Sequence, residues 1–173
     1  MPDATVTAPK SLSISEMTAS VITVSDSCAR GQRTDASGPA VTSELEKRGF
    51  TVSASEVVPD EQPLIEQTIT KLAASSNLVV TTGGTGLGAR DVTPEATRAV
   101  CDRLVEGIAE RMRAEGARST PLAALSRAVC GIRGKTLVLN LPGSPRAAVE
   151  SLAAVAELLP HALELLQGKT DHS

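Results

Sequence analysis

The chain has 173 residues, of which 41% are hydrophobic and 21% are charged, and its formal net charge is −3. This length suits one domain that buries its core without disulfide or metal support. The negative charge and a single aromatic residue, Phe50, argue against nucleic-acid binding, which needs basic surfaces and stacking side chains. The two histidines, His161 and His172, lie near the C-terminus, which disfavours a Ser-His-Asp triad or a multi-histidine metal site.

The termini and the cysteines indicate a cytoplasmic protein with no membrane association. No run of about 18 apolar residues occurs, and the first 19 residues contain no signal-peptide core. Cys28, Cys101 and Cys130 are odd in number and widely spaced, as expected for reduced thiols. We predict flexible tails at residues 1–19 and 169–173 around one domain at residues 20–168.

Four apolar segments predict strands, at residues 21–24, 50–58, 78–80 and 136–141. Three of them are almost continuously apolar, which is typical of a parallel sheet covered on both faces. The segment 50–58 alternates between polar and apolar residues, which places it nearer an edge. Residues 129–133 and 136–141, joined by Gly134 and Lys135, predict a hairpin and therefore one antiparallel strand.

Helical patterns lie between the strands, over residues 39–48, 61–74, 94–103 and 145–167. The first stops at Gly49, as a helix with a C-terminal glycine cap does. The second carries one apolar stripe, formed by Leu64, Ile65, Ile69 and Leu72. We expect Thr93 to cap the third helix, Ser144 to begin the last and Pro160 to break it. Strands alternating with helices predict an α/β fold, with three α/β/α layers and a mostly parallel sheet.

Unusual sequence follows the carboxyl end of each predicted parallel strand, where open α/β sheets bind ligands. The four loops are Ser25-Asp26-Ser27, Pro59-Asp60-Glu61, Thr81 to Asp91, and Pro142-Gly143-Ser144-Pro145. The third has glycines at 83, 84, 86 and 88, which let backbone N–H groups approach an anion closely. It is not a P-loop, because Ala89-Arg90 stands where Lys-Ser/Thr is required.

Two carboxylates, Asp60 and Asp91, belong to these loops. They could face each other across the site and hold Mg²⁺ together with substrate phosphates. Equally, Asp60 could only cap the helix that follows it, and Asp91 could be a solvated residue before the Thr93 cap. Four arginines in or beside the loops would favour an anionic ligand; they are Arg30, Arg33, Arg90 and Arg146.

The four loops together resemble the signature of the molybdenum-cofactor biosynthesis domain family. The resemblance is carried by Thr-Thr-Gly-Gly-Thr-Gly at 81–86 and by Arg-Asp-Val-Thr-Pro-Glu-Ala-Thr at 90–97. Ser25-Asp26, Val58-Pro59-Asp60-Glu61 and Leu141-Pro142-Gly143-Ser144-Pro145 look like the other three loops of that family. The similarity covers residues 20–168 and is greatest to the stand-alone members of the Mog/MoaB type.

The resemblance implies an adenylyltransferase reaction, in which molybdopterin and ATP give adenylylated molybdopterin and pyrophosphate with Mg²⁺. It implies that Asp60 and Asp91 are the catalytic, metal-holding pair. It also implies nucleotide and pterin-phosphate contacts from ten residues: Ser25, Thr82, Gly83, Gly84, Thr85, Gly86, Arg90, Pro142, Gly143 and Ser144. A homotrimer and a molybdate-inserting partner enzyme are further implications. The surplus of apolar residues in the segment 147–166 would suit such a subunit contact.

Three other functions remain open on the same scaffold. The chain could be a MoaB-like paralogue with altered activity, a nucleotide hydrolase, or a non-catalytic trimeric pterin-binding protein. Asp60 and Asp91 argue against a pure binder, which has little use for two carboxylates facing phosphate.

Overall fold

The computed structural model describes residues 13–169. Its six-stranded sheet has the order β2-β1-β3-β6-β5-β4. The strands are β1 (Thr18–Val24), β2 (Thr51–Val58), β3 (Leu78–Thr82), β4 (Arg103–Leu104), β5 (Cys130–Arg133) and β6 (Thr136–Leu141). β2, β1, β3 and β6 pair in parallel, whereas β5 runs antiparallel to both β6 and β4. The predicted hairpin, the single antiparallel strand and the edge position of the alternating segment are therefore confirmed.

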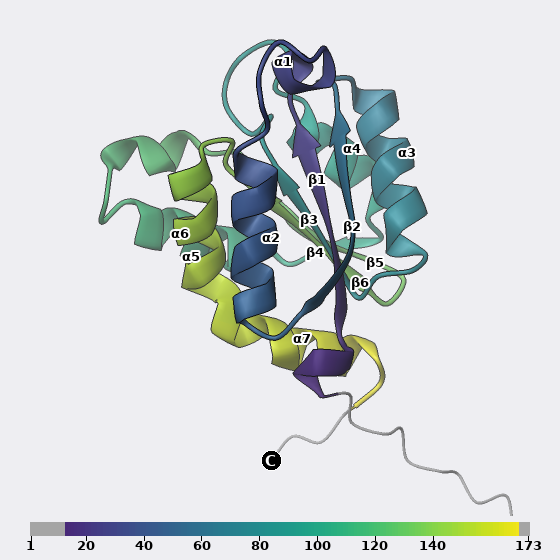
Figure 1. Ribbon diagram of the computed structural model, residues 1–173. Helices are drawn as coiled ribbons and strands as arrows, with labels where there is room; N and C mark the ends of the chain where they lie inside the picture. The colour runs from purple at the N-terminus through teal and green to yellow at the C-terminus, as the bar shows by residue number, and fades with distance from the viewer. Residues whose placement is uncertain (1–12, 170–173) are drawn as a thin grey trace, which may run out of the picture.

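Helices cover both faces of the sheet, which confirms the predicted three layers (Figure 1). The longer helices are α2 (Ser37–Lys47), α3 (Gln62–Ala73), α4 (Thr93–Val100), α5 (Glu106–Gly116), α6 (Pro145–Val155) and α7 (Leu159–Leu166). Short helical segments are α1 (Asp26–Ala29), η1 (Ile14–Glu16), η2 (Pro121–Leu125) and η3 (Ala156–Leu158). One core joins α2, α5, α6 and α7 to the sheet, and a second joins α3 and α4 to its other face. No helix among residues 13–169 is long and apolar enough to span a bilayer.

Several local predictions need correction. Leu64 was placed on the apolar stripe of α3, yet its exposure is 38%, because the buried face of the helix consists of Ile65, Thr68, Ile69 and Leu72. α4 ends at Val100 rather than at residue 103, since Arg103 pairs with Ile132 in β4. Thr93 lies inside α4 and its hydroxyl donates to the Gly83 carbonyl, so it is not the cap.

The C-terminal region follows the predicted pattern in outline. Ser144 caps α6 by accepting a hydrogen bond from Ala147 N at 3.1 Å. The helix is interrupted at η3, and Pro160 lies in the first turn of α7, where its missing N–H costs nothing. Several of the surplus apolar side chains here are in the chain's own core; the buried ones are Ala148, Leu152, Val155, Ala156, Leu159 and Leu163.

The predicted N-terminal tail overlaps with ordered structure. Its first 12 residues lie outside the described residues, as do 170–173 of the C-terminal tail. Met17 is 1% exposed, and Thr18 and Ala19 already belong to β1, so the boundary predicted after residue 19 falls inside a strand.

The carboxyl ends of β1, β2, β3 and β6 lie along one edge of the sheet because these four strands are parallel. The loops that leave these ends form the top of the molecule in Figure 1. Residues with unusual sequence in four separate loops are thus brought to the same edge.

Candidate functional site at the carboxyl edge of the sheet

Two neighbouring cavities open at this edge. The first, which we call the polar cavity, has a volume of about 390 Å³ and lies between the loops after β1, β2, β3 and β6 and the start of α2. The second, the apolar cavity, has a volume of about 450 Å³ and lies between the glycine-rich loop, α5, η2 and α6. The two share Gly84, Asp91 and Gly143, so the glycine-rich loop forms the boundary between them.

Nine of the ten predicted binding residues and both predicted catalytic residues line one or both cavities. Those at the polar cavity are Ser25, Asp60, Thr82, Gly83, Gly84, Asp91, Gly143 and Ser144. Those at the apolar cavity are Gly84, Thr85, Gly86, Asp91, Pro142 and Gly143. Arg90 lines neither cavity, because its guanidinium points to Asp26.

Asp60 faces the polar cavity instead of capping α3. Its Oδ2 accepts a hydrogen bond from Asp26 N at 2.8 Å, and no side chain caps α3. No described residue donates to its Oδ1. Burial raises the pKa of Asp60 above its ordinary value, and the nearby carboxylates of Asp26 and Asp91 add to the rise. A cation beside Asp60 would therefore stabilise its ionised form, which burial and the two nearby carboxylates disfavour.

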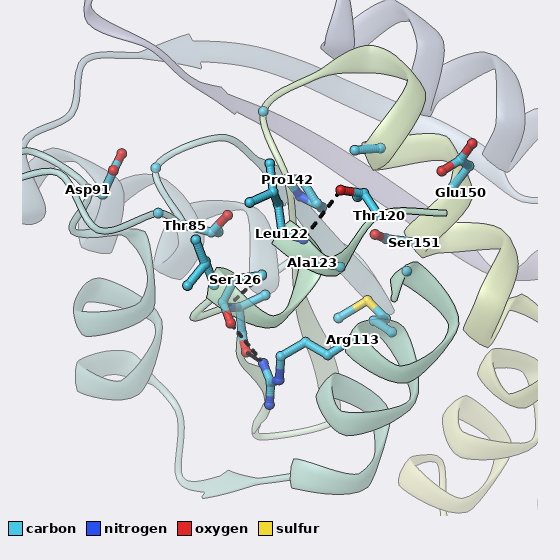
Figure 2. Close-up of a pocket in the computed structure, with 18 residues that line it drawn as sticks. Thr85, Asp91, Arg113, Thr120, Leu122, Ala123, Ser126, Pro142, Glu150 and Ser151 are labelled. Atoms are coloured by element: carbon cyan, nitrogen blue, oxygen red, sulfur yellow. Dashed lines mark hydrogen bonds between the residues drawn. The ribbon is translucent and has the colours of Figure 1, made fainter. Parts of the chain in front are cut away.

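Asp91 is held by its own loop. Its Oδ2 accepts from Gly88 N at 2.8 Å, and its N–H donates to the Gly88 carbonyl at 3.0 Å. A Cβ on either Gly86 or Gly88 would come within 2.9 Å of Asp91 Oδ2, so the small residues leave room for this carboxylate. Figure 2 shows Asp91 at the rim of the apolar cavity, on the side of Thr85.

In the glycine-rich loop, several backbone carbonyls bind other residues of the protein, whereas several backbone N–H groups bind none of the described residues. Thr93 binds the carbonyls of Gly83 and Gly84, and Arg127 binds those of Thr85, Gly86 and Asp91. The N–H groups of Gly84, Thr85 and Gly86 donate to no residue within 13–169. Unpaired N–H groups beside a cavity form an anion-binding concavity, as the glycine pattern predicted.

Two of the glycines are required by their backbone conformation. Gly83 has φ +100° and Gly84 has φ +68°, in the region that side chains rarely adopt. A Cβ on Gly83 would lie 2.3 Å from the Val24 carbonyl, and one on Gly84 would lie 2.3 Å from Thr93 Oγ1. Gly86 lacks a positive φ, so its small size matters only for the space around Asp91.

The start of α2 completes the polar cavity. Asp35 accepts from Gly38 N at 3.0 Å and from Thr23 Oγ1 at 2.8 Å, which ties the first turn of α2 to β1. Arg33 and Ser37 line the cavity beside it, as does Cys28. An anion here would meet the positive end of a helix and one guanidinium.

Asp26 joins three of the loops, a role the sequence analysis did not assign. Its Oδ1 accepts from Asp60 N at 3.0 Å, and Arg90 binds both of its oxygens, at 2.5 and 3.0 Å. The hydrogen bond from Arg90 lowers the pKa of Asp26 to about 2. The sequence marked Asp26 only as a member of the first loop, since its partners lie 34 and 64 positions away.

Arg127 is the second residue that the sequence analysis missed. Its Nε donates to Gly86 O at 2.8 Å, its Nη2 donates to Asp91 O at 2.6 Å, and its Nη1 pairs with Glu95. Lying between η2 and β5, it belongs to a segment for which no element was predicted.

Aliphatic and small polar side chains line the apolar cavity (Figure 2). Leu122, Leu125 and Met112 are its largest apolar side chains, and Leu122 is 69% exposed. Thr120 and Ser126 add hydroxyl groups, so the cavity suits a flat ring with a few polar edges.

The donor set fits one Mg²⁺ ion that is shared with a phosphate. Among residues 13–169, no group of three or more His, Cys, Asp and Glu side chains is placed to hold a metal. Mg²⁺ is usually bound by one or two carboxylates together with substrate phosphates, and Asp60 and Asp91 supply that number at the polar cavity.

Fold and cavities together define an α/β protein whose candidate ligand site lies at the carboxyl edge of a mostly parallel sheet. The family described as "Probable molybdopterin binding domain" matches residues 20–161, and the chain belongs to this family. Because the match spans all four loops of the site, both cavities lie within the family domain.

Known relatives agree with this assignment. The chain is 40% identical over 152 residues to the molybdopterin adenylyltransferase of Helicobacter pylori J99, covering 86% of each chain. It is 40% identical to the molybdenum cofactor synthesis protein cinnamon of Drosophila melanogaster, covering 87% of this chain but only 26% of that protein. The crystal structure of the molybdopterin biosynthesis enzyme MoaB from Thermus thermophilus is 52% identical, with a TM-score of 0.83, covering 88% of this chain and 98% of that one.

Proposed function

We propose that this protein transfers the adenylyl group of ATP to molybdopterin and releases pyrophosphate. The observation that carries the proposal is the meeting of two cavities at one carboxylate, Asp91, beside unpaired N–H groups of the glycine-rich loop. Two cavities suit two substrates, and the N–H groups suit the phosphates through which those substrates react. The names of the relatives support the same reaction.

The reaction needs alignment and charge neutralisation more than proton transfer. The terminal phosphate of molybdopterin is already a nucleophile, so it can attack the α-phosphorus of ATP without a general base. The bond from this phosphorus to the bridging oxygen breaks, and the electron pair leaves with pyrophosphate. Backbone N–H groups of Gly84, Thr85 and Gly86 would hold the phosphate oxygens in place while charge builds on the leaving group.

Asp60 and Asp91 are the residues that would hold Mg²⁺. When bound, the ion supplies charge neutralisation for phosphate oxygens. The raised pKa of Asp60 has a consequence for activity, because only its ionised form serves this role. Mg²⁺ would therefore compete with a proton at Asp60, and its binding should tighten as the pH rises.

The remaining parts of the proposal concern assembly and location. We propose a homotrimer, with a molybdate-inserting enzyme as the partner that receives the product. The three cysteines are free thiols, which suits the cytoplasm. Sedimentation at micromolar concentration tests the assembly, and a monomer of about 18 kDa would contradict it.

Incubation with molybdopterin, ATP and Mg²⁺, followed by detection of adenylylated pterin and pyrophosphate, tests the reaction. Equal amounts of the two products support the proposal. Tight pterin binding without turnover would favour the non-catalytic alternative. Release of pyrophosphate or phosphate without adenylylated pterin would favour a nucleotide hydrolase.

A further inference from the structure

Arg127 gathers several contacts on the glycine-rich loop. Its guanidinium reaches the carbonyls of Gly86 and Asp91, and its own N–H donates to the Thr85 carbonyl at 2.9 Å. Three carbonyls on the same side of the glycine-rich loop thus meet one residue. The side chain is 35% exposed, and its remaining nitrogen pairs with Glu95 in the first turn of α4.

These contacts orient three peptides of the glycine-rich loop. In a trans peptide the carbonyl and the N–H of the next residue point in opposite directions, so the bound carbonyls set the directions of the N–H groups of Gly86, Leu87 and Val92. Of these three residues, Gly86 lines the apolar cavity. Side-chain packing does not hold residues 86 and 87, since Leu87 is 68% exposed and Gly86 has no side chain. The contact to the Asp91 carbonyl fixes the backbone from which the shared carboxylate projects.

Arg127 lies in the chain between two residues of the wall of the apolar cavity. Its neighbours Ser126 and Ala128 line that cavity, as do Leu125 and Leu122 of η2. Displacement of this wall by a bound ring would be transmitted through the guanidinium to the backbone of Gly86 and Asp91. One side chain thus links the wall of one cavity to the carboxylate shared by both.

We infer that Arg127 is a positioning residue, which holds the glycine-rich loop and Asp91 in the geometry for adenylyl transfer and couples them to the wall of the apolar cavity. The inference rests on the proposed function for its kinetic part. Its structural part, the restraint on residues 83–92, is independent of any substrate.

The chain offers a matched control in Arg111. This residue also donates to a carbonyl, Ala154 O at 2.9 Å, and pairs with a carboxylate, Glu157. It is 44% exposed and lines neither cavity. Arg111→Met therefore removes a comparable set of contacts away from the site.

The first test is hydrogen exchange on the full chain without ligands. In Arg127→Met we expect the hydrogen-bonded amides of Gly83, Gly88 and Asp91 to exchange about tenfold faster, because the restraint on the loop that carries them is lost. Arg111→Met should leave these amides at the wild-type rate. Equal exchange of these amides in the two variants would overturn the inference even if the protein proves not to be an adenylyltransferase.

The second test is the kinetics of adenylyl transfer. In Arg127→Met we expect kcat to fall about tenfold or more, a larger change than in either KM, because misplaced reacting groups slow the chemical step. Arg127→Lys keeps the charge but cannot reach three groups at once, so it should recover less than half of the loss. Full recovery by lysine, in either exchange or kcat, would show that charge alone matters and would overturn the inference.

The exchange and kinetic tests remain possible if Arg127→Met does not fold. Arg127→Lys then carries the test, since it retains a positive group beside Glu95. Faster exchange in 83–92 together with a lowered kcat supports the inference, and wild-type values for both overturn it. Inactivity of the wild-type protein would overturn the proposed function while leaving the exchange result valid.

Discussion

The polar and apolar cavities share three residues but are made from different kinds of structure. Strand ends surround the polar cavity, and each is fixed by a parallel sheet that is buried on both faces. Helices α5 and α6 and the short segment η2 surround the apolar cavity, and the contacts of Arg127 and Arg113 hold its wall. Under the proposed function, the groups that react lie at strand ends, and the wall formed by helices and η2 faces the part of a ligand that does not react.

Asp91→Asn should have the largest effect, because Asp91 serves both cavities. Asparagine keeps the size of the side chain and can still accept from Gly88 N, but it removes the charge that would hold Mg²⁺. We expect turnover to fall about 100-fold or more, with a melting temperature near that of the wild type. Steady-state kinetics and thermal unfolding measure the two, and wild-type turnover would remove Asp91 from the proposed catalytic pair.

Gly86→Ala should weaken activity more than stability. The added Cβ meets only Asp91 Oδ2, at 2.9 Å, and the backbone has no positive φ to strain. We expect turnover to fall about tenfold from the displaced carboxylate, while unfolding changes by less than about 1 kcal/mol.

Gly107→Ala is the control for this change, since a Cβ there meets nothing within 4 Å. It should leave activity unchanged and slightly stabilise α5. Loss of stability in Gly86→Ala without loss of activity would mean that the loop acts only as a turn.

Leu122→Ala should separate the two cavities. If the apolar cavity takes the ring of one substrate, the KM of that substrate should rise about three- to tenfold, while the KM of the other stays near wild type. Leu87→Ala is the control, because Leu87 is equally exposed but lines neither cavity. Equal increases for both substrates would contradict the division of labour between the cavities.

Asp26→Asn should have the smallest effect, and this effect should disappear in acid. The pKa of Asp26 is lowered to about 2 in the folded protein, so its stabilising contribution is present above the unfolded value of about 3.8 and is lost as the pH falls toward 2. The difference in urea stability between wild type and variant should therefore be larger at pH 5 than at pH 2.5. It should stay modest, because Arg90 is largely exposed. A difference that does not change with pH would contradict this assignment.

The difference between the two cavities also explains which of them could be predicted from local sequence patterns. The polar cavity follows from sequence because strands end where β-branched runs meet glycine, proline and aspartate, and parallel strands bring those ends together. Eight of the predicted residues line it for this reason. The apolar cavity was not predicted, because α5 and η2 have no loop motif or signal of the kind that marks a strand end.

The sequence by itself determined the layers of the fold, the edge that carries the site and the acidic pair at that edge. Local patterns suffice for these features, since periodicity sets which residues are buried and glycine sets where the backbone can turn. Only the tertiary structure decided the partners of Asp26 and of the Arg127 side chain. The partners of Asp26 lie 34 and 64 positions away along the chain, and those of the Arg127 side chain lie 32 to 41 positions away. Polar side chains bind the groups that lie near them in space, and no local sequence pattern predicts which distant carbonyl or carboxylate will lie beside them.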